Sequence, residues 1–169
     1  SITESALLAL DDAGLSNVRL SDLVAGVGLA GVNLPVLFEQ MSAWQHPFKA
    51  MHLTTDLLIA CLGAHQGKDG AVMISGTGSC GFSYVDQRPV MVGAHGFPHG
   101  DKGSGAWIGL QATKNVLLSL DGLIEPTTLN QDILTHTKAQ DALALVEAIA
   151  GKPATYYAQL AGYVFARAN

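Results

Sequence analysis

The chain has 169 residues, 49% of them hydrophobic, and a formal net charge of −5, so it can bury a substantial core as one domain or two small lobes. Its few basic residues are scattered, which argues against nucleic acid or an anionic membrane as a partner, and no apolar run reaches the roughly 18 residues that span a bilayer. Cys61 and Cys80 form no CxxC motif and no signal peptide is recognised, which favours a reducing cytoplasm.

The first part of the chain has the alternation that is typical of an α/β fold. Apolar residues recur with helical spacing, then give way to continuous apolar runs that suit buried strands. Pro35 suits the first turn of a helix. The predicted order is helix, strand, helix, strand and helix, over residues 2–13, 24–32, 35–44, 48–53 and 54–64.

The pattern changes after the turn at 67–70, where we place a boundary between two lobes, 1–67 and 68–169. Short strands joined by tight turns predict an antiparallel meander, and a loop rich in Gly and His leads from it into helices. Trp107 and Ile108 fit the buried face of the first of these helices, and Trp44 is expected to pack at a lobe edge. The strands are predicted over 71–75, 80–85 and 89–93, and the helices over about 104–120, 127–150 and 155–168.

One turn of the meander combines glycines with hydroxyl side chains. Gly76 and Gly78 allow backbone N–H groups to approach a ligand closely, while Ser75, Thr77 and Ser79 supply donors suited to phosphate oxygens. A phosphate-binding hairpin is therefore one interpretation. Turn geometry alone can also require Gly-x-Gly, so both interpretations stay open at this point.

Asp56 stands where a predicted strand ends and a helix begins. Ligands of α/β proteins bind at such places, so the carboxylate is a candidate general base. A carboxylate at a helix N-terminus also complements the helix dipole and caps backbone N–H groups without any catalytic role.

Asp101 lies between glycines in the segment Gly100-Asp101-Lys102-Gly103-Ser104-Gly105, just ahead of the long helix. It can face a ligand across open backbone, or it can be the helix N-cap. His95 and His99 share its loop, and two imidazoles with a carboxylate can bind a transition metal. No second ligand cluster with standard spacing follows, so a structural zinc site is not predicted.

The order of these segments resembles a known family. Residues 53–56 (Leu-Thr-Thr-Asp), 74–79 (Ile-Ser-Gly-Thr-Gly-Ser) and 96–109 (Gly-Phe-Pro-His-Gly-Asp-Lys-Gly-Ser-Gly-Ala-Trp-Ile-Gly) are similar to the N-acetylglucosamine and glucosamine kinases of the BadF/BadG/BcrA/BcrD type of ATPases. That resemblance implies an α/β, ribonuclease H-like (actin-like ATPase) fold of two lobes, with mixed sheets flanked by helices. It also implies ATP-dependent phosphorylation of the 6-hydroxyl of an amino sugar.

The resemblance also assigns roles to residues. Asp56 would be the base that deprotonates the sugar hydroxyl, and ATP phosphates would bind at the second of two phosphate loops. Mg²⁺ would arrive with ATP rather than bind in a dedicated protein site. The phosphate loop would be formed by Gly76, Thr77 and Gly78, and the sugar would be contacted by Ala30, Gly31, Ser79, Cys80, His95, Gly96, Phe97 and Asp101.

Two residues that differ from the family's usual pattern bear on which sugar is bound. Lys102 stands where an acidic residue is common, and His95 replaces a Trp that is common in the animal N-acetylglucosamine kinases. The Gly-Phe-Pro form of the loop at 96–98 looks more like bacterial glucosamine kinases. The resemblance therefore favours glucosamine, with its amine facing Asp101, over N-acetylglucosamine.

The family's first phosphate loop and its adenosine-binding segment have no counterpart in these residues. We therefore expect a fragment, incomplete at both ends of the fold and inactive by itself. The cysteine usage favours a cytoplasmic enzyme, and the resemblance alone implies a homodimer. Two other functions remain open. One is an ATPase activator of a CoA-ester reductase or dehydratase, although Cys61 and Cys80 lack the expected cluster spacing. The other is a non-catalytic actin-like module that binds sugar or nucleotide, which would not need a carboxylate at Asp56.

Overall fold

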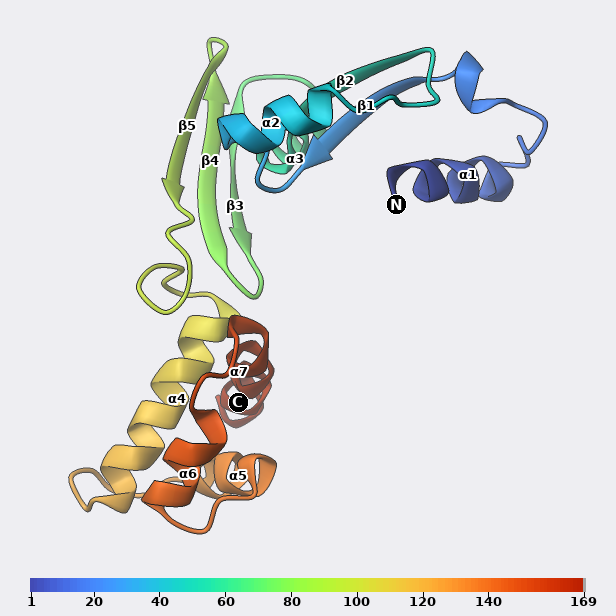
Figure 1. Cartoon of the computed structure of the whole chain (residues 1–169). Helices are drawn as coiled ribbons and strands as arrows, with labels where there is room; N and C mark the ends of the chain where they lie inside the picture. The colour runs from blue at the N-terminus through green and yellow to red at the C-terminus, as the bar shows by residue number, and fades with distance from the viewer. Residues whose placement is uncertain (169) are drawn as a thin grey trace. The chain divides into compact units, whose positions relative to one another are not determined.

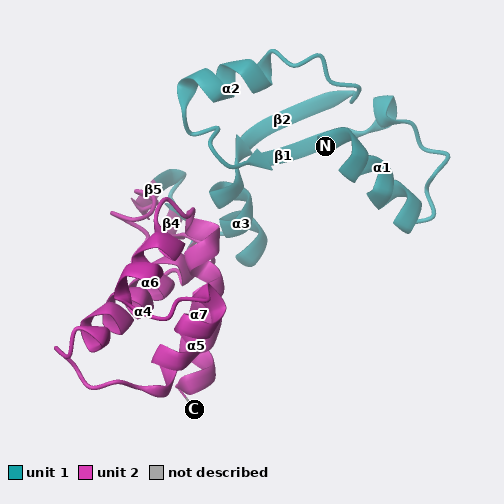
Figure 2. Ribbon diagram, turned by 60° about the horizontal axis from the view of Figure 1, so that its bottom comes forward, with its two compact units in different colours: residues 1–70, 84–89 teal, residues 71–83, 90–169 magenta. Residues whose placement is uncertain are grey.

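The computed structural model describes residues 1–168, and Figure 1 shows its elements in chain order. The described residues form two compact units, coloured separately in Figure 2. Unit 1 comprises residues 1–70 and the hairpin tip at 84–89, and unit 2 comprises residues 71–83 and the chain from 90 onward. No helix in the described part of the chain has the length and apolar character needed to cross a membrane.

Unit 1 contains a parallel pair of strands with helices packed against it. The strands pair in register from Val24 opposite Ala50 to Leu29 opposite Thr55. The helix between the two strands begins with Pro35 in its first turn, as predicted, and the next helix follows the second strand without a gap. The predicted α/β alternation is therefore confirmed. The elements are α1 (Ile2–Asp12), a short 3-10 helix (Leu20–Asp22), β1 (Val24–Leu29), α2 (Pro35–Ser42), β2 (Ala50–Thr55) and α3 (Asp56–Ala64).

A meander of three strands follows, in the spatial order β3, β4, β5. Neighbouring strands run in opposite directions (Figure 1), so the predicted antiparallel meander is confirmed. The turn between β4 and β5 has positive φ at Asp86 and Gln87, 49° and 59°, as a two-residue hairpin of this kind requires. The strands are β3 (Gly70–Ser75), β4 (Ser79–Val85) and β5 (Arg88–Gly93).

The helices of unit 2 enclose the main hydrophobic core. Gly109 permits a close approach of α4 to α7, because a Cβ at this position would collide with the carbonyl group of Tyr157. The four helices are α4 (Gly105–Leu120), α5 (Thr128–Thr137), α6 (Ala142–Ile149) and α7 (Ala154–Arg167). The buried cluster consists of Ala106, Ala112, Val116, Ile133, Ala139, Leu145, Tyr157 and Leu160.

Two sequence predictions need correction here. The helical region predicted around 127–150 is interrupted, because Lys138 ends α5 in the left-handed conformation (φ 57°) and the Asp141 side chain caps a new helix by accepting from Ala144 N at 2.9 Å. Trp107 and Ile108 are only half-buried. The inward face of α4 carries smaller side chains, as the close packing of α4 against α7 requires.

Trp44 is half-buried in unit 1, where its ring meets the rings of His46 and Phe48 edge-on at centroid distances of 6.1 and 6.3 Å. Phe48 is buried. This small aromatic cluster fits the packing role expected for Trp44.

Candidate functional site

The turn between β3 and β4 is bonded directly to the start of α4. Gly76 N donates to Gly78 O at 2.9 Å within the turn. The turn carbonyls of Gly76 and Thr77 then accept from Gly105 N at 2.8 Å and Ala106 N at 3.2 Å. The first N–H groups of a helix have no partner within it, and here the turn supplies partners for two of them. The N-terminus of α4 therefore anchors the turn rather than presenting these donors to a ligand.

The serines that flank the turn also bond to the loop before α4. Ser79 Oγ donates to Lys102 O at 2.9 Å, and Ser75 Oγ donates to Gly103 O at 3.3 Å. The hydroxyl groups of Ser75 and Ser79, which were predicted to donate to phosphate oxygens, instead donate to carbonyl groups of the protein. A ligand at this turn would meet the Thr77 side chain and the backbone, while the oxygen of Ser79 keeps its capacity to accept.

Asp101 lies against the turn. A Cβ added to Gly78 would come 2.8 Å from Asp101 Oδ2, so the absence of a side chain at Gly78 makes room for the carboxylate. The N-cap of α4 is Ser104, which is fully buried and whose Oγ accepts from Trp107 N at 3.1 Å. The interpretation of Asp101 as a helix N-cap is therefore wrong, and its half-buried carboxylate is not used in capping.

The loop from 94 to 100 is fixed at both ends. Ala94 N donates to Ser79 O at 3.2 Å, and Gly100 N donates to Gly96 O at 2.6 Å. The Phe97 ring packs on the Tyr157 ring with centroids 5.0 Å apart, while His95 stays exposed at the surface of the loop. Among the described residues, no group of three or more His, Cys, Asp and Glu side chains gathers as a metal site would require.

These segments of unit 2 line a pocket of about 620 Å³ that is open to solvent. Two walls were expected from the sequence, because the β3–β4 turn supplies Thr77 and Gly78 and the loop before α4 supplies Phe97 and Asp101. The third wall was not expected. It is the connection between α6 and α7, whose residues form no recognisable sequence motif. The lining residues are Thr77, Gly78, Phe97, Pro98, Asp101, Leu110, Gly151, Lys152, Pro153, Ala154 and Tyr157.

Asp56 is the first residue of α3, directly after β2. Its Oδ1 accepts from Leu57 N at 2.9 Å, but the helix cap is Thr55, whose Oγ1 accepts from Leu58 N at 3.2 Å. The N-cap residue is thus Thr55, while Asp56, as the non-catalytic interpretation expected, accepts from a backbone N–H in the first turn of the helix. Its half-buried carboxylate retains capacity to accept a proton or a hydrogen bond from a substrate.

Ala30 and Gly31 follow β1 as Asp56 follows β2. Because Leu29 pairs with Thr55 in the parallel sheet, the residues after them leave the same edge of the sheet. The structure therefore brings the predicted residues of unit 1 together at one strand edge. The predicted residues of unit 2 gather around the turn and the loop, with Cys80 half-buried on β4 beside Ser79.

Comparison with known proteins gives consistent matches. A model of the BadF/BadG/BcrA/BcrD ATPase family matches residues 1–169. The chain is 39% identical to glucosamine kinase GspK of Vibrio cholerae over 142 residues, which is 80% of this chain and 46% of that protein. It is 37% identical to an N-acetylmuramic acid/N-acetylglucosamine kinase of Clostridium acetobutylicum over 98 residues, 57% of this chain and 32% of that protein. The chain thus spans half or less of the curated relatives it matches.

Solved structures match over nearly the whole chain. A protein of Chromobacterium violaceum assigned as an N-acetylglucosamine kinase superposes with a TM-score of 0.81 at 32% identity, covering 99% of this chain and 61% of that one. A second protein with the same assignment, from Porphyromonas gingivalis, gives a TM-score of 0.62 at 22% identity and supports the fold alone. These matches confirm the predicted α/β fold of the actin-like ATPase type.

Proposed function

We propose, because the chain belongs to the BadF/BadG/BcrA/BcrD ATPase family, that the full-length protein transfers a phosphoryl group from ATP to an amino sugar. The acceptor we propose is the 6-hydroxyl of glucosamine, in preference to N-acetylglucosamine. Two curated relatives named as amino-sugar kinases support the reaction class. The Gly-Phe-Pro loop at 96–98 supports the choice of sugar.

We assign the ATP phosphates to the β3–β4 turn. The observation that carries this assignment is that Thr77 and Gly78 of this turn line the pocket of unit 2. The space around Gly76 is open, since an added Cβ there would meet no atom within 4 Å, so a phosphate can approach the turn. Gly76 N already donates to Gly78 O, and we therefore expect the contacts to come from Thr77 and Gly78. Mg²⁺ would accompany ATP and neutralise part of its charge.

The sugar is assigned to the loop before α4 and the residues next to it. Asp101 is the proposed partner of the sugar amine, because a carboxylate pairs well with an ammonium group. Phe97 adds an apolar wall that its contact with Tyr157 holds in place. The remaining proposed contacts are Ala30, Gly31, Ser79, Cys80, His95 and Gly96.

Asp56 is the proposed general base. Phosphoryl transfer depends mainly on positioning and charge stabilisation, with one carboxylate to accept the proton of the attacking hydroxyl. Asp56 suits this role because one of its oxygens is oriented by Leu57 N while helix capping falls to Thr55. A boundary of the two kinase lobes near 67–70, a homodimer and a cytoplasmic location remain predictions of the same proposal.

The test is a coupled assay of ADP release by the full-length protein with glucosamine, N-acetylglucosamine, glucose or no sugar. Release that requires an amino sugar, fastest with glucosamine, is the expected result. Hydrolysis that is independent of sugar would favour the reductase-activator function instead. ATP binding without any release would favour a non-catalytic module.

A further inference from the structure

The third wall of the pocket is a short connection whose backbone is fixed by hydrogen bonds. The carbonyl of Ile149, the last residue of α6, accepts from Lys152 N at 3.2 Å and from Tyr157 Oη at 3.0 Å. Tyr157 is buried in the core and also packs on Phe97. The connection is therefore held against the core and the loop before α4, and Lys152 extends from a defined backbone position.

The charges around the pocket are few. Of its lining residues only Asp101 and Lys152 are charged, and they come from different segments. ATP brings several negative charges, and a carboxylate in the same pocket repels them. Other lysines of unit 2 do not line this pocket: Lys102, next to Asp101, and Lys114 on α4 are exposed, and Lys138 lines a separate surface pocket beside α5. Among the residues that line the pocket, Lys152 is therefore the one cation.

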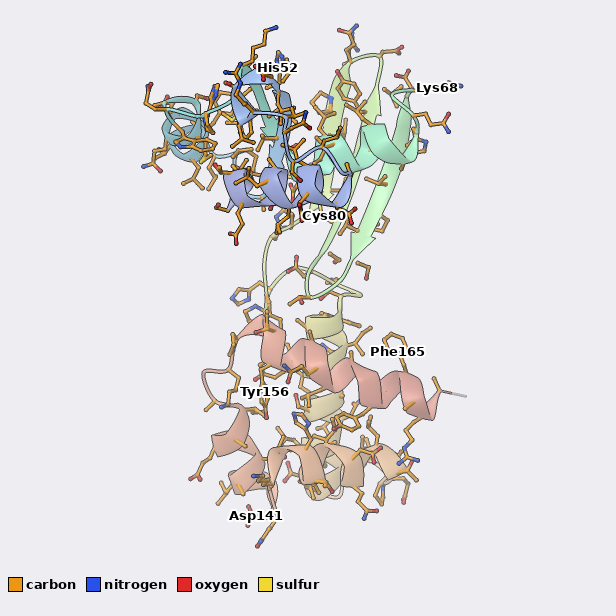
Figure 3. The ribbon with its side chains drawn as sticks, turned by 90° about the vertical axis from the view of Figure 1, so that its right-hand side faces the viewer. His52, Lys68, Cys80, Asp141, Tyr156 and Phe165 are labelled. Carbon is orange, nitrogen blue, oxygen red and sulfur yellow. The ribbon has the colours of Figure 1, made fainter. Side chains whose placement is uncertain are left out.

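The Lys152 side chain is exposed, and its ammonium group lies 5.2 Å from the centroid of the Tyr156 ring. Tyr156 stands near the start of α7, while Phe165 lies near its other end (Figure 3). A cation over an aromatic ring at an exposed site is held weakly. Lys152 forms none of the ion pairs found among residues 1–168. Its ammonium group can therefore leave the ring for a stronger partner at little cost.

We propose that Lys152 makes an ionic contact with the phosphates of ATP and so sets the affinity of the enzyme for nucleotide. This inference rests on the proposed binding of ATP phosphates at Thr77 and Gly78. It assigns a binding role to the connection between α6 and α7, with Tyr156 as the site on which the lysine rests when no nucleotide is bound. The Lys152 charge acts on ATP binding rather than on the sugar or on proton transfer.

The experiment compares full-length wild-type protein with Lys152→Met, Lys152→Arg and the control Lys114→Met. ATP affinity is measured by calorimetry without sugar, and KM and kcat are measured for ATP and glucosamine. Loss of a charged contact predicts that Lys152→Met raises both the Kd and the KM for ATP about ten-fold. We expect KM for glucosamine and kcat to stay within about two-fold. Lys152→Arg should retain most of the affinity and Lys114→Met all of it.

Salt provides a readout that a purely structural role would not change. Raising KCl from about 50 to about 300 mM should weaken ATP binding more steeply in the wild type than in Lys152→Met, because screening acts on the charge that the variant lacks. Tyr156→Leu removes the ring on which the lysine rests and also that ring's contacts with His136 and Tyr157, so its Tm is measured as well. At unchanged Tm it should bind ATP at least as tightly as the wild type.

Unchanged ATP affinity in Lys152→Met overturns the inference. A matching loss in Tyr156→Leu at unchanged Tm overturns it too, since the lysine would then act by packing on α7. The calorimetric measurement separates this result from a failure of the proposed function. A protein that phosphorylates no sugar would refute the proposed reaction, while the difference in ATP affinity between wild type and Lys152→Met would still decide the role of Lys152.

Discussion

The proposed base and the proposed phosphate site are held in different ways. Asp56 takes its position from its neighbours in sequence, because its backbone starts α3 and its side chain bonds to Leu57 N. Thr77 and Asp101 take theirs from hydrogen bonds between the β3–β4 turn and the loop before α4. The first arrangement lets a side chain change with little effect on the fold. In the second, a change at one segment displaces another.

The substitution Asp56→Asn tests the first arrangement and has the largest expected effect. The amide oxygen can still accept from Leu57 N, so the fold and ATP affinity should stay near wild type. Loss of a general base lowers turnover by roughly 10²–10⁴-fold. The measurements are kcat with glucosamine, Kd for ATP by calorimetry, and Tm, with the exposed Glu39→Gln on α2 as control. Turnover within about ten-fold of wild type would exclude Asp56 as the base.

Gly78→Ala tests the second arrangement. The new Cβ would stand 2.8 Å from Asp101 Oδ2, so either the carboxylate or the turn must move. We expect KM for both ATP and glucosamine to rise, by about ten-fold, together with a loss of stability of about 1–3 kcal/mol from overpacking. A matched control is Gly162→Ala on α7, where an added Cβ meets no atom within 4 Å. A variant that changes only one KM would show that turn and loop act independently.

Ser104→Ala removes the cap of α4 without touching the pocket lining. Its buried hydroxyl accepts from Trp107 N, so the variant leaves that N–H without its partner at the helix start. The expected loss is about 1–2 kcal/mol of unfolding free energy, measured in urea, with kcat nearly unchanged. Asn115→Ala, at an exposed position in the same helix, is the control. A large loss of kcat at unchanged stability would show that Ser104 affects the pocket and not only the start of α4.

The same contrast explains how much the sequence could predict. Local signals predicted the strands, with ends two or three residues off in unit 1, and also Pro35 at the start of α2, the meander and Asp56 at the start of a helix, because each depends on neighbouring residues. The break between α5 and α6 was missed although Asp141 is a good N-cap, since helical periodicity continues on both sides.

Long-range packing decided the rest. The wall formed by 151–154 follows from the close contact of α4 with α7 at Gly109, and no local pattern encodes that contact. The roles of Ser75 and Ser79 also changed, because their hydroxyls bond to carbonyls of a loop that is distant in sequence. Chemistry-bearing residues were therefore predictable, while the groups that hold them were not.

An ion pair that lies in neither the proposed base nor the proposed phosphate site has the smallest expected effect. Arg167 on α7 donates to Asp132 on α5 through Nε at 2.7 Å and Nη2 at 2.9 Å. The hydrogen bond from Arg167 lowers the pKa of Asp132 below its ordinary value of 3.8. A carboxyl whose pKa is lower in the folded state stabilises the fold above the unfolded-state pKa, and this contribution is lost as pH falls through the folded-state pKa.

The variant Arg167→Gln should therefore be slightly less stable than wild type at neutral pH. The difference should shrink as pH falls below the ordinary carboxyl pKa of 3.8 and vanish as pH passes the lower pKa of Asp132 in the folded state. Added salt should shrink it as well, because the pair is solvent-exposed. Urea unfolding across this pH range measures the effect, with Arg19→Gln, which breaks the exposed pair to Asp22 in unit 1, as comparison. Neither arginine lines the pocket. Any change in ATP affinity in Arg167→Gln would therefore mean that the packing of α5 against α7 supports the pocket wall between α6 and α7.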